Sequence, residues 1–172
     1  MRWPALAALA LVLAGCGAAE APAPLLSASA LPGLHQASRP LDAAALAAAT
    51  PLPGLRGRLK EWRLRRAGER EFTGVARSLT HVVARTVDFS EPAGAAAYQR
   101  ALVAGADRYL GRGAQRARMD DGWLIRAPAC SCRPQPPTLI AVVRHGARVG
   151  WLSVSGPAAT AARTRALAGR LP

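Results

Sequence analysis

Two closely spaced cysteines are the residues whose chemistry is easiest to specify. Cys130 and Cys132 are separated by one residue, so a strand would place both sulfur atoms on one face, at the upper limit of the Cα separation that a disulfide allows. The proline-rich stretch 133–137 favours a turn, which would bring the two sulfur atoms closer. We therefore interpret Cys130 and Cys132 as a plain disulfide, which closes a small ring and adds modest stability.

Two other uses of this cysteine pair stay open. A strained, exposed bridge is easily reduced, so Cys130 and Cys132 could exchange disulfides with a partner. Together with His81 or His145, the two thiolates would instead form a soft site suited to Zn or Cu(I). The chain has only three histidines, and each is expected to be an ordinary solvated or hydrogen-bonded side chain. We therefore expect no metal site and no cofactor.

The remaining cysteine, Cys16, follows a short apolar run. Arg2 supplies a positive charge, residues 3–13 are almost all apolar, and the run is too short to span a bilayer, which takes about 20 residues. The order Leu13-Ala14-Gly15-Cys16 resembles the lipobox of bacterial lipoproteins, where cleavage precedes a cysteine that carries acyl chains such as palmitate. An ordinary secretory signal with a chance cysteine is the alternative. We predict a signal peptide over residues 1–15 and lipidation at Cys16.

This leader predicts where the protein works. A lipid on Cys16 would attach the mature chain to a membrane outside the cytoplasm, because two or more acyl chains hold a protein firmly. The location is then the cell envelope: the outer face of the cell membrane, or the outer membrane of a Gram-negative source. Such a compartment is oxidising, which also favours a disulfide.

The composition after Cys16 predicts two further parts of the chain. Residues 17–54 are rich in Ala, Pro, Leu and Ser and lack aromatic residues, so they are expected to bury too little apolar surface to fold. We predict a lipidated cysteine and flexible tether over residues 16–54, with a span of roughly 30 to 35 Å. Residues 55–172 are expected to form one globular domain.

The chain is strongly basic. Its 23 Lys and Arg residues against 10 Asp and Glu residues give a net charge of +13, which attracts anionic lipids or envelope polymers. An arginine-rich group around one tryptophan is our candidate anionic surface; its members are Arg56, Arg58, Lys60, Trp62, Arg63, Arg65, Arg66 and Arg70. Arg112, Arg116 and Arg118 are candidates to extend it. An ordinary solvated basic face is the alternative. Nucleic acid is not expected as a partner, because the chain is exported and carries no recognition motif; any protein partner is unknown.

Hydrophobic patterns predict the elements of the globular part. Alternation favours short strands over residues 58–66 and 71–75, joined by a turn at residues 67–70, and a stronger strand over residues 78–89. Apolar residues then recur at helical spacing from Ser90, the expected N-cap, to Gly111. Two hairpins follow, the first around Asp120-Asp121-Gly122 and the second around His145-Gly146, with a terminal helix from Gly156-Pro157.

This order predicts an α+β fold, with a single antiparallel sheet and two main helices packed on it. It resembles small envelope lipoproteins of high-GC bacteria that carry a PsbP/Mog1-like or related sensor-type domain. The resemblance covers residues 55–172 and depends on these segments: Thr86-Val87-Asp88-Phe89, the helix around Tyr98, Leu139-Ile140-Ala141-Val142-Val143, His145-Gly146-Ala147-Arg148-Val149, Trp151-Leu152 and Ser155-Gly156-Pro157-Ala158-Ala159. It implies a non-catalytic binding, sensor or accessory role, and no functional residues carry over.

Catalytic motifs are not found in the sequence. It has no Gly-x-Ser-x-Gly elbow and no glycine loop that would cradle a phosphate before a helix. Asp120 and Asp121 precede a glycine, which is typical of a turn rather than of an acid–base pair. His81 and Asp88 are seven residues apart on one predicted strand, so their side chains would face opposite sides. We therefore expect a protein that is not an enzyme.

Overall fold

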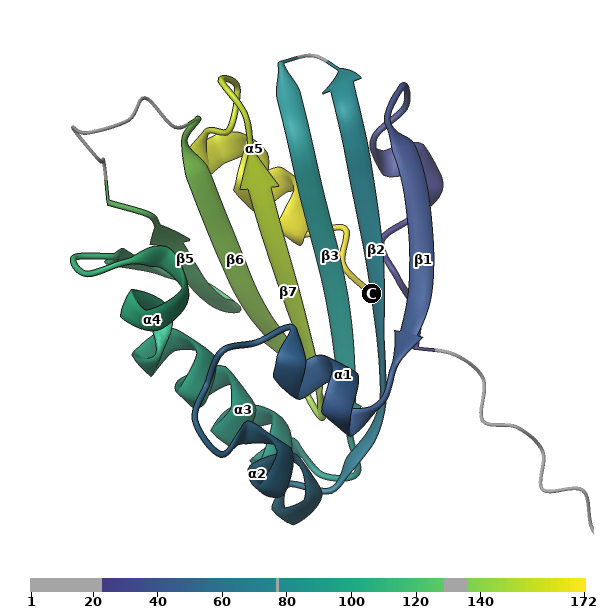
Figure 1. Ribbon diagram of the computed structural model, residues 1–172, viewed down its shortest axis with the longest axis vertical. Coiled ribbons are helices and arrows are strands. Elements are labelled where there is room, and N and C mark those ends of the chain that lie inside the picture. The colour runs from purple at the N-terminus through teal and green to yellow at the C-terminus, as the bar shows by residue number, and fades with distance from the viewer. Residues whose placement is uncertain (1–22, 77, 129–135) are drawn as a thin grey trace, which may run out of the picture.

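The computed structural model describes residues 23–76, 78–128 and 136–172. They form an α+β fold built on one seven-stranded antiparallel sheet with the order β1-β2-β3-β7-β6-β5-β4 (Figure 1). The α+β class and the single antiparallel sheet are as the sequence predicts. The strands are β1 His35–Leu41, β2 Leu64–Ala76, β3 Leu79–Phe89, β4 Gln115–Met119, β5 Gly122–Arg126, β6 Thr138–His145 and β7 Arg148–Ser155. The helices are η1 Ala28–Ala30, α1 Ala43–Ala48, α2 Leu55–Glu61, α3 Pro92–Ala104, α4 Ala106–Leu110 and α5 Ala161–Ala168.

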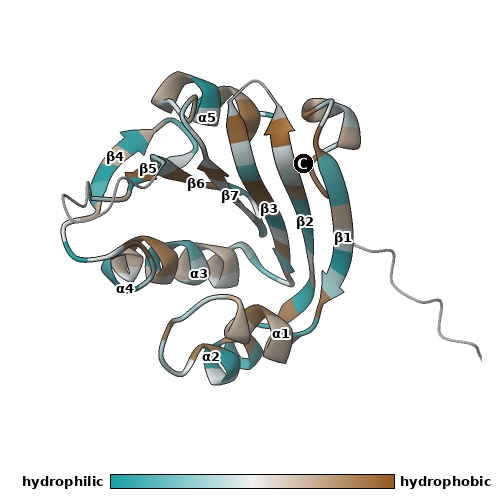
Figure 2. Ribbon diagram, turned by 45° about the horizontal axis from the view of Figure 1, so that its top comes forward, coloured by the Kyte–Doolittle hydropathy of each residue, from teal (hydrophilic) through white to brown (hydrophobic). Residues whose placement is uncertain are grey.

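The sheet separates two hydrophobic cores. On β3, Val87 and Phe89 point to the side covered by α1 to α4, which we call the front face. Val82 and Ala84 point to the back face, which α5 and residues 23–34 cover. Figure 1 views the molecule from the front, and Figure 2 shows apolar residues gathered along the strands between the two coverings. Because both faces are covered, β6 is apolar on both sides, as expected of a central strand.

The predicted tether is wrong from residue 23 onward. The strand β1 pairs with β2 along its whole length, from His35 opposite Thr73 to Leu41 opposite Ala67. Leu26 is fully buried in the back core and Leu46 in the front core. The segment folds because its scattered leucines fill gaps in cores built by the rest of the chain, and because the long strand β2 offers a free edge. Residues 16–22, like the predicted signal peptide, lie outside the described residues.

The first two predicted strands are also corrected. Residues 55–61 form α2, which buries Leu55 and Leu59 at helical spacing, and not the start of a strand. Residues 67–70 continue β2 and do not form a turn. The alternation of charged and apolar residues around Trp62 therefore reflects the end of a helix and the start of a strand. The stronger prediction over residues 78–89 is confirmed as β3.

The helix boundaries differ in detail from the prediction. The N-cap of α3 is Glu91, while Ser90 donates its hydroxyl to the carbonyl of Arg63 at 3.3 Å. Gly105 divides the predicted single helix into α3 and α4, and Gly111 ends it as expected. The terminal helix starts after Thr160, whose side chain accepts from the amide of Arg163. Both predicted hairpins are confirmed, β4–β5 and β6–β7.

Candidate functional site

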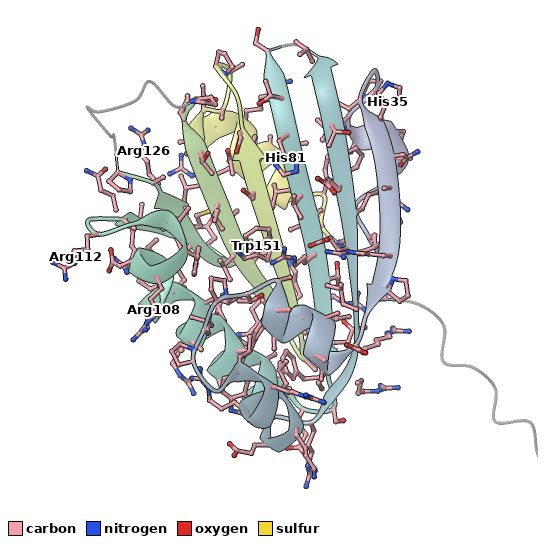
Figure 3. The ribbon with its side chains drawn as sticks, viewed as in Figure 1. His35, His81, Arg108, Arg112, Arg126 and Trp151 are labelled. Carbon is pink, nitrogen blue, oxygen red and sulfur yellow. The ribbon has the colours of Figure 1, made fainter. Side chains whose placement is uncertain are left out.

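A pocket of about 460 Å³ opens on the front face between α1 and α4. Its floor is formed by β3, β7 and β6, one wall by the loop after α1, and the other wall by the end of α3 and by α4. Figure 3 shows Trp151 over the middle of the sheet and Arg108 on α4. The lining residues are Ala49, Thr50, Pro51, Arg85, Leu102, Arg108, Tyr109, Leu110, Thr138, Ile140, Trp151 and Ser153.

Arg85 is held rigidly at the floor of this pocket. Its Nε donates to a carboxylate oxygen of Glu69, and its Nη1 donates to the carbonyl of Ala49 at 3.0 Å. Its guanidinium carbon lies 4.5 Å from the ring centroid of Trp151, directly opposite it in the β3–β7 register. Within the part of the chain that the structure describes, Nη2 of Arg85 forms no hydrogen bond. This nitrogen is therefore available to a ligand.

Glu69 supports Arg85 from outside the pocket. Arg39, on β1, donates to the same carboxylate at 3.0 and 2.7 Å. Burial alone would raise the pKa of Glu69, but the hydrogen bonds and positive charges of Arg85 and Arg39 outweigh burial and lower the pKa below its ordinary value. One carboxylate thus neutralises one of two arginines, and the group keeps a net positive charge.

Thr50 supplies a second polar group to the pocket. The residue is 4% exposed; its side chain lies beside the phenol of Tyr98 and lowers the pKa of that phenol, but its Oγ1 makes no well-formed hydrogen bond within the described residues. A buried hydroxyl without a partner costs about 1–3 kcal/mol, so such groups call for an explanation. The hydroxyl of Thr86 is likewise unpartnered, but Thr86 does not line the pocket. A molecule in this pocket can therefore complete the hydrogen bonding of Thr50.

The charges that line the pocket are positive. Among the described residues that line it, Arg85 and the exposed Arg108 are ionised and none is acidic. The hydroxyl of Tyr109 donates to the carbonyl of Leu102 at 2.7 Å, and burial raises the pKa of this phenol, which therefore stays neutral. Below the pocket, burial raises the pKa of Tyr98 to about 12, against the lowering effects of the Thr50 side chain and of the charge of Arg85. Since most of the remaining lining is apolar, the site suits a ligand with an apolar body and an anionic group.

The predicted anionic surface is divided between two faces of the molecule. Arg56, Arg58 and Lys60 lie on α2, followed by Trp62, Arg63 and Arg65 at the start of β2. By contrast, Arg66 donates to Asp88 at 2.7 Å on the back face. Arg70 also points to the back, where it donates to Ser38 Oγ at 2.7 Å and to the carbonyl of Leu26 at 2.6 Å. Alternate residues of a strand face opposite sides, so β2 cannot present all its arginines together.

The candidates to extend this surface lie elsewhere. Arg116 and Arg118 are on β4, at the edge of the sheet opposite to β1. Arg116 donates to Asp107 at 2.8 Å, and Arg118 stacks 4.9 Å from the ring of Trp123. Arg112 is exposed in the loop before β4. These residues do not join the α2 surface.

The histidines and acidic residues are placed mostly as predicted. His81 Nε2 lies 2.7 Å from a carboxylate oxygen of Glu71 on the open part of the front face. Asp88 faces the back, and Asp120 and Asp121 form the β4–β5 turn. In the described ranges no three His, Cys, Asp or Glu residues are grouped as they would be around a metal ion.

Cys16, Cys130 and Cys132 lie outside the described residues. The lipidation, disulfide, exchange and soft-metal hypotheses for them therefore stay predictions. No helix within the described ranges has the length and apolar character needed to cross a membrane.

Comparisons with known proteins identify no family. No protein family model matches the chain, and no curated protein matches it in sequence. The site must therefore be interpreted from its own geometry.

Sequence reasoning did not find the pocket. Thr50 fell within the predicted tether, and Trp151 was considered only as a strand residue. One signal was available: Arg85 is a charged residue in the middle of an apolar strand, where a charge is buried only with partners. Its partners Glu69 and Ala49 come from distant segments, so the sequence could not specify what Arg85 would do.

Proposed function

We propose that this chain is a lipid-anchored envelope protein whose α+β domain binds a small amphipathic anion without chemically changing it. The anchor would be a diacylglyceryl group on Cys16, as the lipobox-like order suggests. The observation that carries the binding role is the guanidinium of Arg85, which is fixed at the pocket floor by Glu69 and Ala49 and whose Nη2 makes no hydrogen bond among the described residues. An accessory or sensor-like role agrees with this site, since the described residues that line it include no nucleophile paired with a His, Asp or Glu base.

The ligand would be bound in two parts. Its apolar body would lie against Leu102, Ile140 and the ring of Trp151. Its anionic group would accept from Nη2 of Arg85 and from Thr50, near the charge of Arg108. A carboxylate, sulfonate or phosphate would satisfy this chemistry, and envelope lipids and polymers supply such groups. The resemblance to envelope lipoproteins with a PsbP/Mog1-like domain agrees with this role and remains part of the proposal.

An aromatic sulfonate tests the pocket directly. Anilinonaphthalene sulfonate combines an apolar body with one negative charge, and its fluorescence rises in an apolar site. We expect saturable binding to the folded protein, with quenching of tryptophan fluorescence that is reduced in Trp151→Phe. Arg108→Gln should weaken binding about two- to five-fold, as removal of a partly exposed charge does.

Arg112→Gln is the matched control for Arg108→Gln. Arg112 is an exposed arginine close in sequence to Arg108, but it does not line the pocket. Its replacement should leave binding unchanged. Equal weakening by both substitutions would mean that the probe responds to overall charge, and the pocket proposal would then fail.

The thiol-disulfide alternative has its own test. Once Cys16 is lipidated, Cys130 and Cys132 are the remaining cysteines of the chain. Titration of free thiols in the purified protein separates a stable bridge, with no free thiol, from a reduced pair that exchanges with small disulfides. Retention of Zn or Cu(I) by the reduced protein would favour the metal version of that alternative.

A further inference from the structure

We propose that the end of the domain formed by α2 docks onto an anionic bilayer. This inference rests on the lipid anchor of the proposed function, and it adds an orientation that the anchor alone does not supply. The docking surface consists of the outward side of α2 and the residue that follows Trp62: Arg56, Arg58, Lys60 and Arg63.

The length of chain before the fold limits how far the domain can be from the membrane. Seven residue steps separate Cys16 from Ala23, the first described residue. A fully extended chain spans at most about 3.6 Å per residue, so Ala23 lies within about 25 Å of the lipidated sulfur. The predicted tether of residues 16–54 would have allowed free rotation well away from the surface. The folded segment from residue 23 removes most of that freedom.

The position of Ala23 decides which end of the domain is near the anchor. Ala23 lines a surface depression together with Pro40, Ala67 and Gly68. Pro40 and Ala67 lie at the last pairs of the β1–β2 ladder, where Leu41 ends β1 and leads into α1. The helix α1 packs on α2, and both lie at this same end of the sheet (Figure 1). The chain therefore enters the fold at the end that carries α2.

The residues of this end give it a net positive charge. Among the described residues, the four basic residues of the docking surface have Glu61 beside them on α2, and Glu91 pairs with Arg63, so basic residues outnumber acidic ones here. Arg56 and Lys60 are exposed, while the buried Leu55 and Leu59 hold the opposite side of α2 against the front core. Each basic residue that approaches an anionic membrane surface within a Debye length adds to the attraction between the domain and the bilayer.

Charge alone would not select this end, because α5 is basic as well. Arg163 and Arg170 lie beside Leu34, which precedes the start of β1. That region is at the opposite end of β1 from Leu41, about 20 Å away along a strand of this length. Arg165 shares its surface depression with Asp120 and Asp121, which reduce its local charge. Proximity to the anchor therefore favours α2 over α5.

Hydrogen exchange on vesicles tests this orientation with the native lipidated protein. The protein is reconstituted into vesicles of phosphatidylcholine alone or with phosphatidylglycerol, and amide exchange is followed by mass spectrometry. We expect slower exchange over α2 and residues 62–66 on the anionic vesicles, unchanged exchange over α5, and loss of the slowing in high salt. Arg56→Gln combined with Lys60→Gln should lose the slowing. Arg112→Gln combined with Arg165→Gln, which removes the same number of exposed charges elsewhere, should keep it.

The outcomes separate this inference from the proposed function. If the same samples carry acyl chains on Cys16 but α2 exchanges equally on both kinds of vesicle, the docking is wrong and the anchor stands. Slowing confined to α5 would mean that the domain has the opposite orientation, and it would also overturn the docking. An unmodified Cys16 would overturn both the anchor and the docking that rests on it.

Discussion

The two faces of the sheet carry similar clusters of charged residues but use them differently. Each holds one carboxylate between two arginines: Glu69 with Arg39 and Arg85 on the front, and Asp88 with Arg66 and Arg148 on the back. On the back, Arg148 uses two nitrogens on Asp88, at 2.6 and 3.2 Å. On the front, Arg85 uses one nitrogen on Glu69 and keeps another for the pocket.

One buried threonine on each side of the sheet shows the same contrast. In α5, on the back, the buried hydroxyl of Thr164 donates to the carbonyl of Thr160 at 2.9 Å. In the loop after α1, on the front, the buried hydroxyl of Thr50 has no partner among the described residues. The back also contains an unpartnered hydroxyl, that of Thr86, but Thr86 does not line the pocket, whereas Thr50 and Arg85 on the front can donate to a molecule bound there. We infer that the back serves stability and the front serves binding.

The largest difference in stability between the two faces is expected when an aromatic side chain is replaced by alanine. Phe72 is fully buried in the back core, so Phe72→Ala should lower the free energy of unfolding by about 3–5 kcal/mol. Trp151, on the front, is only partly buried beside the pocket, so Trp151→Ala should cost clearly less while weakening binding of the sulfonate probe. Urea unfolding of both variants measures the two costs. Equal costs would contradict the distinction between a closed back and an open front.

A close contact between α3 and the backbone of Trp62 gives a second test. A Cβ on Gly94 would lie 2.3 Å from the carbonyl oxygen of Trp62, so Gly94→Ala should destabilise the fold by about 1–3 kcal/mol. Gly57 lies in α2 with nothing within 4 Å of a Cβ. Gly57→Ala should therefore stabilise the protein by about 0.5–1 kcal/mol, because alanine is the better helix former. Thermal unfolding of the two variants checks both signs. A loss of stability in Gly57→Ala would contradict this prediction, because it would mean that helix propensity does not decide the effect of the substitution.

The two carboxylate clusters predict how the free energy of unfolding depends on pH. Arginine neighbours outweigh burial and lower the pKa of Asp88 as well as that of Glu69, from ordinary values of 3.8 and 4.5. A group whose pKa is lowered by folding contributes stability above its ordinary pKa, and that contribution disappears as the pH falls through the folded value. Stability should therefore fall below about pH 4.5 in the wild type.

Two neutral variants sharpen this prediction. Asp88→Asn and Glu69→Gln should each make the acid-side decline of stability shallower, since each removes one of the two titrations, and each should cost about 1–3 kcal/mol at neutral pH. Urea unfolding between pH 3 and pH 7, an interval of roughly four pH units around these values, measures both effects. Glu69→Gln should also weaken probe binding, because it frees Arg85 to move, whereas Asp88→Asn should not. A slope unchanged in both variants would contradict the assignment.

The smallest expected effect is the difference in stability between Thr164→Val and Thr50→Val. Thr164→Val removes a made hydrogen bond and should cost about 1 kcal/mol. Thr50→Val removes a hydroxyl that makes no well-formed hydrogen bond among the described residues, so it should cost less stability than Thr164→Val, while it weakens an anionic ligand by up to about ten-fold. Thermal unfolding with and without the probe measures both. A clear loss of stability in Thr50→Val would mean that its hydroxyl already has a partner in the folded protein.

Some elements of the fold could be predicted because their signals are local. The strand β3 and the central strand β6 follow from runs of β-branched and apolar residues, and the β4–β5 turn follows from Asp120 and Asp121 before a glycine. The helix around Tyr98 follows from apolar spacing, although its division at Gly105 does not. There Leu52 occupies the space that a side chain would need: its Cδ2 would be 2.2 Å from a Cβ on Gly105. That neighbour comes from the predicted tether.

The sequence alone determined the α+β class, the two hairpins, the basic charge and the lipobox-like order at Cys16, because each depends on residues close together in the chain. Only the tertiary structure decided that residues 23–54 fold, since their leucines are buried only when both cores exist to receive them. It also decided the pocket, which brings together Thr50, Arg85 and Trp151 from three separate segments. A binding site is a property of such distant contacts, and local patterns cannot encode which partner a buried arginine or hydroxyl will meet.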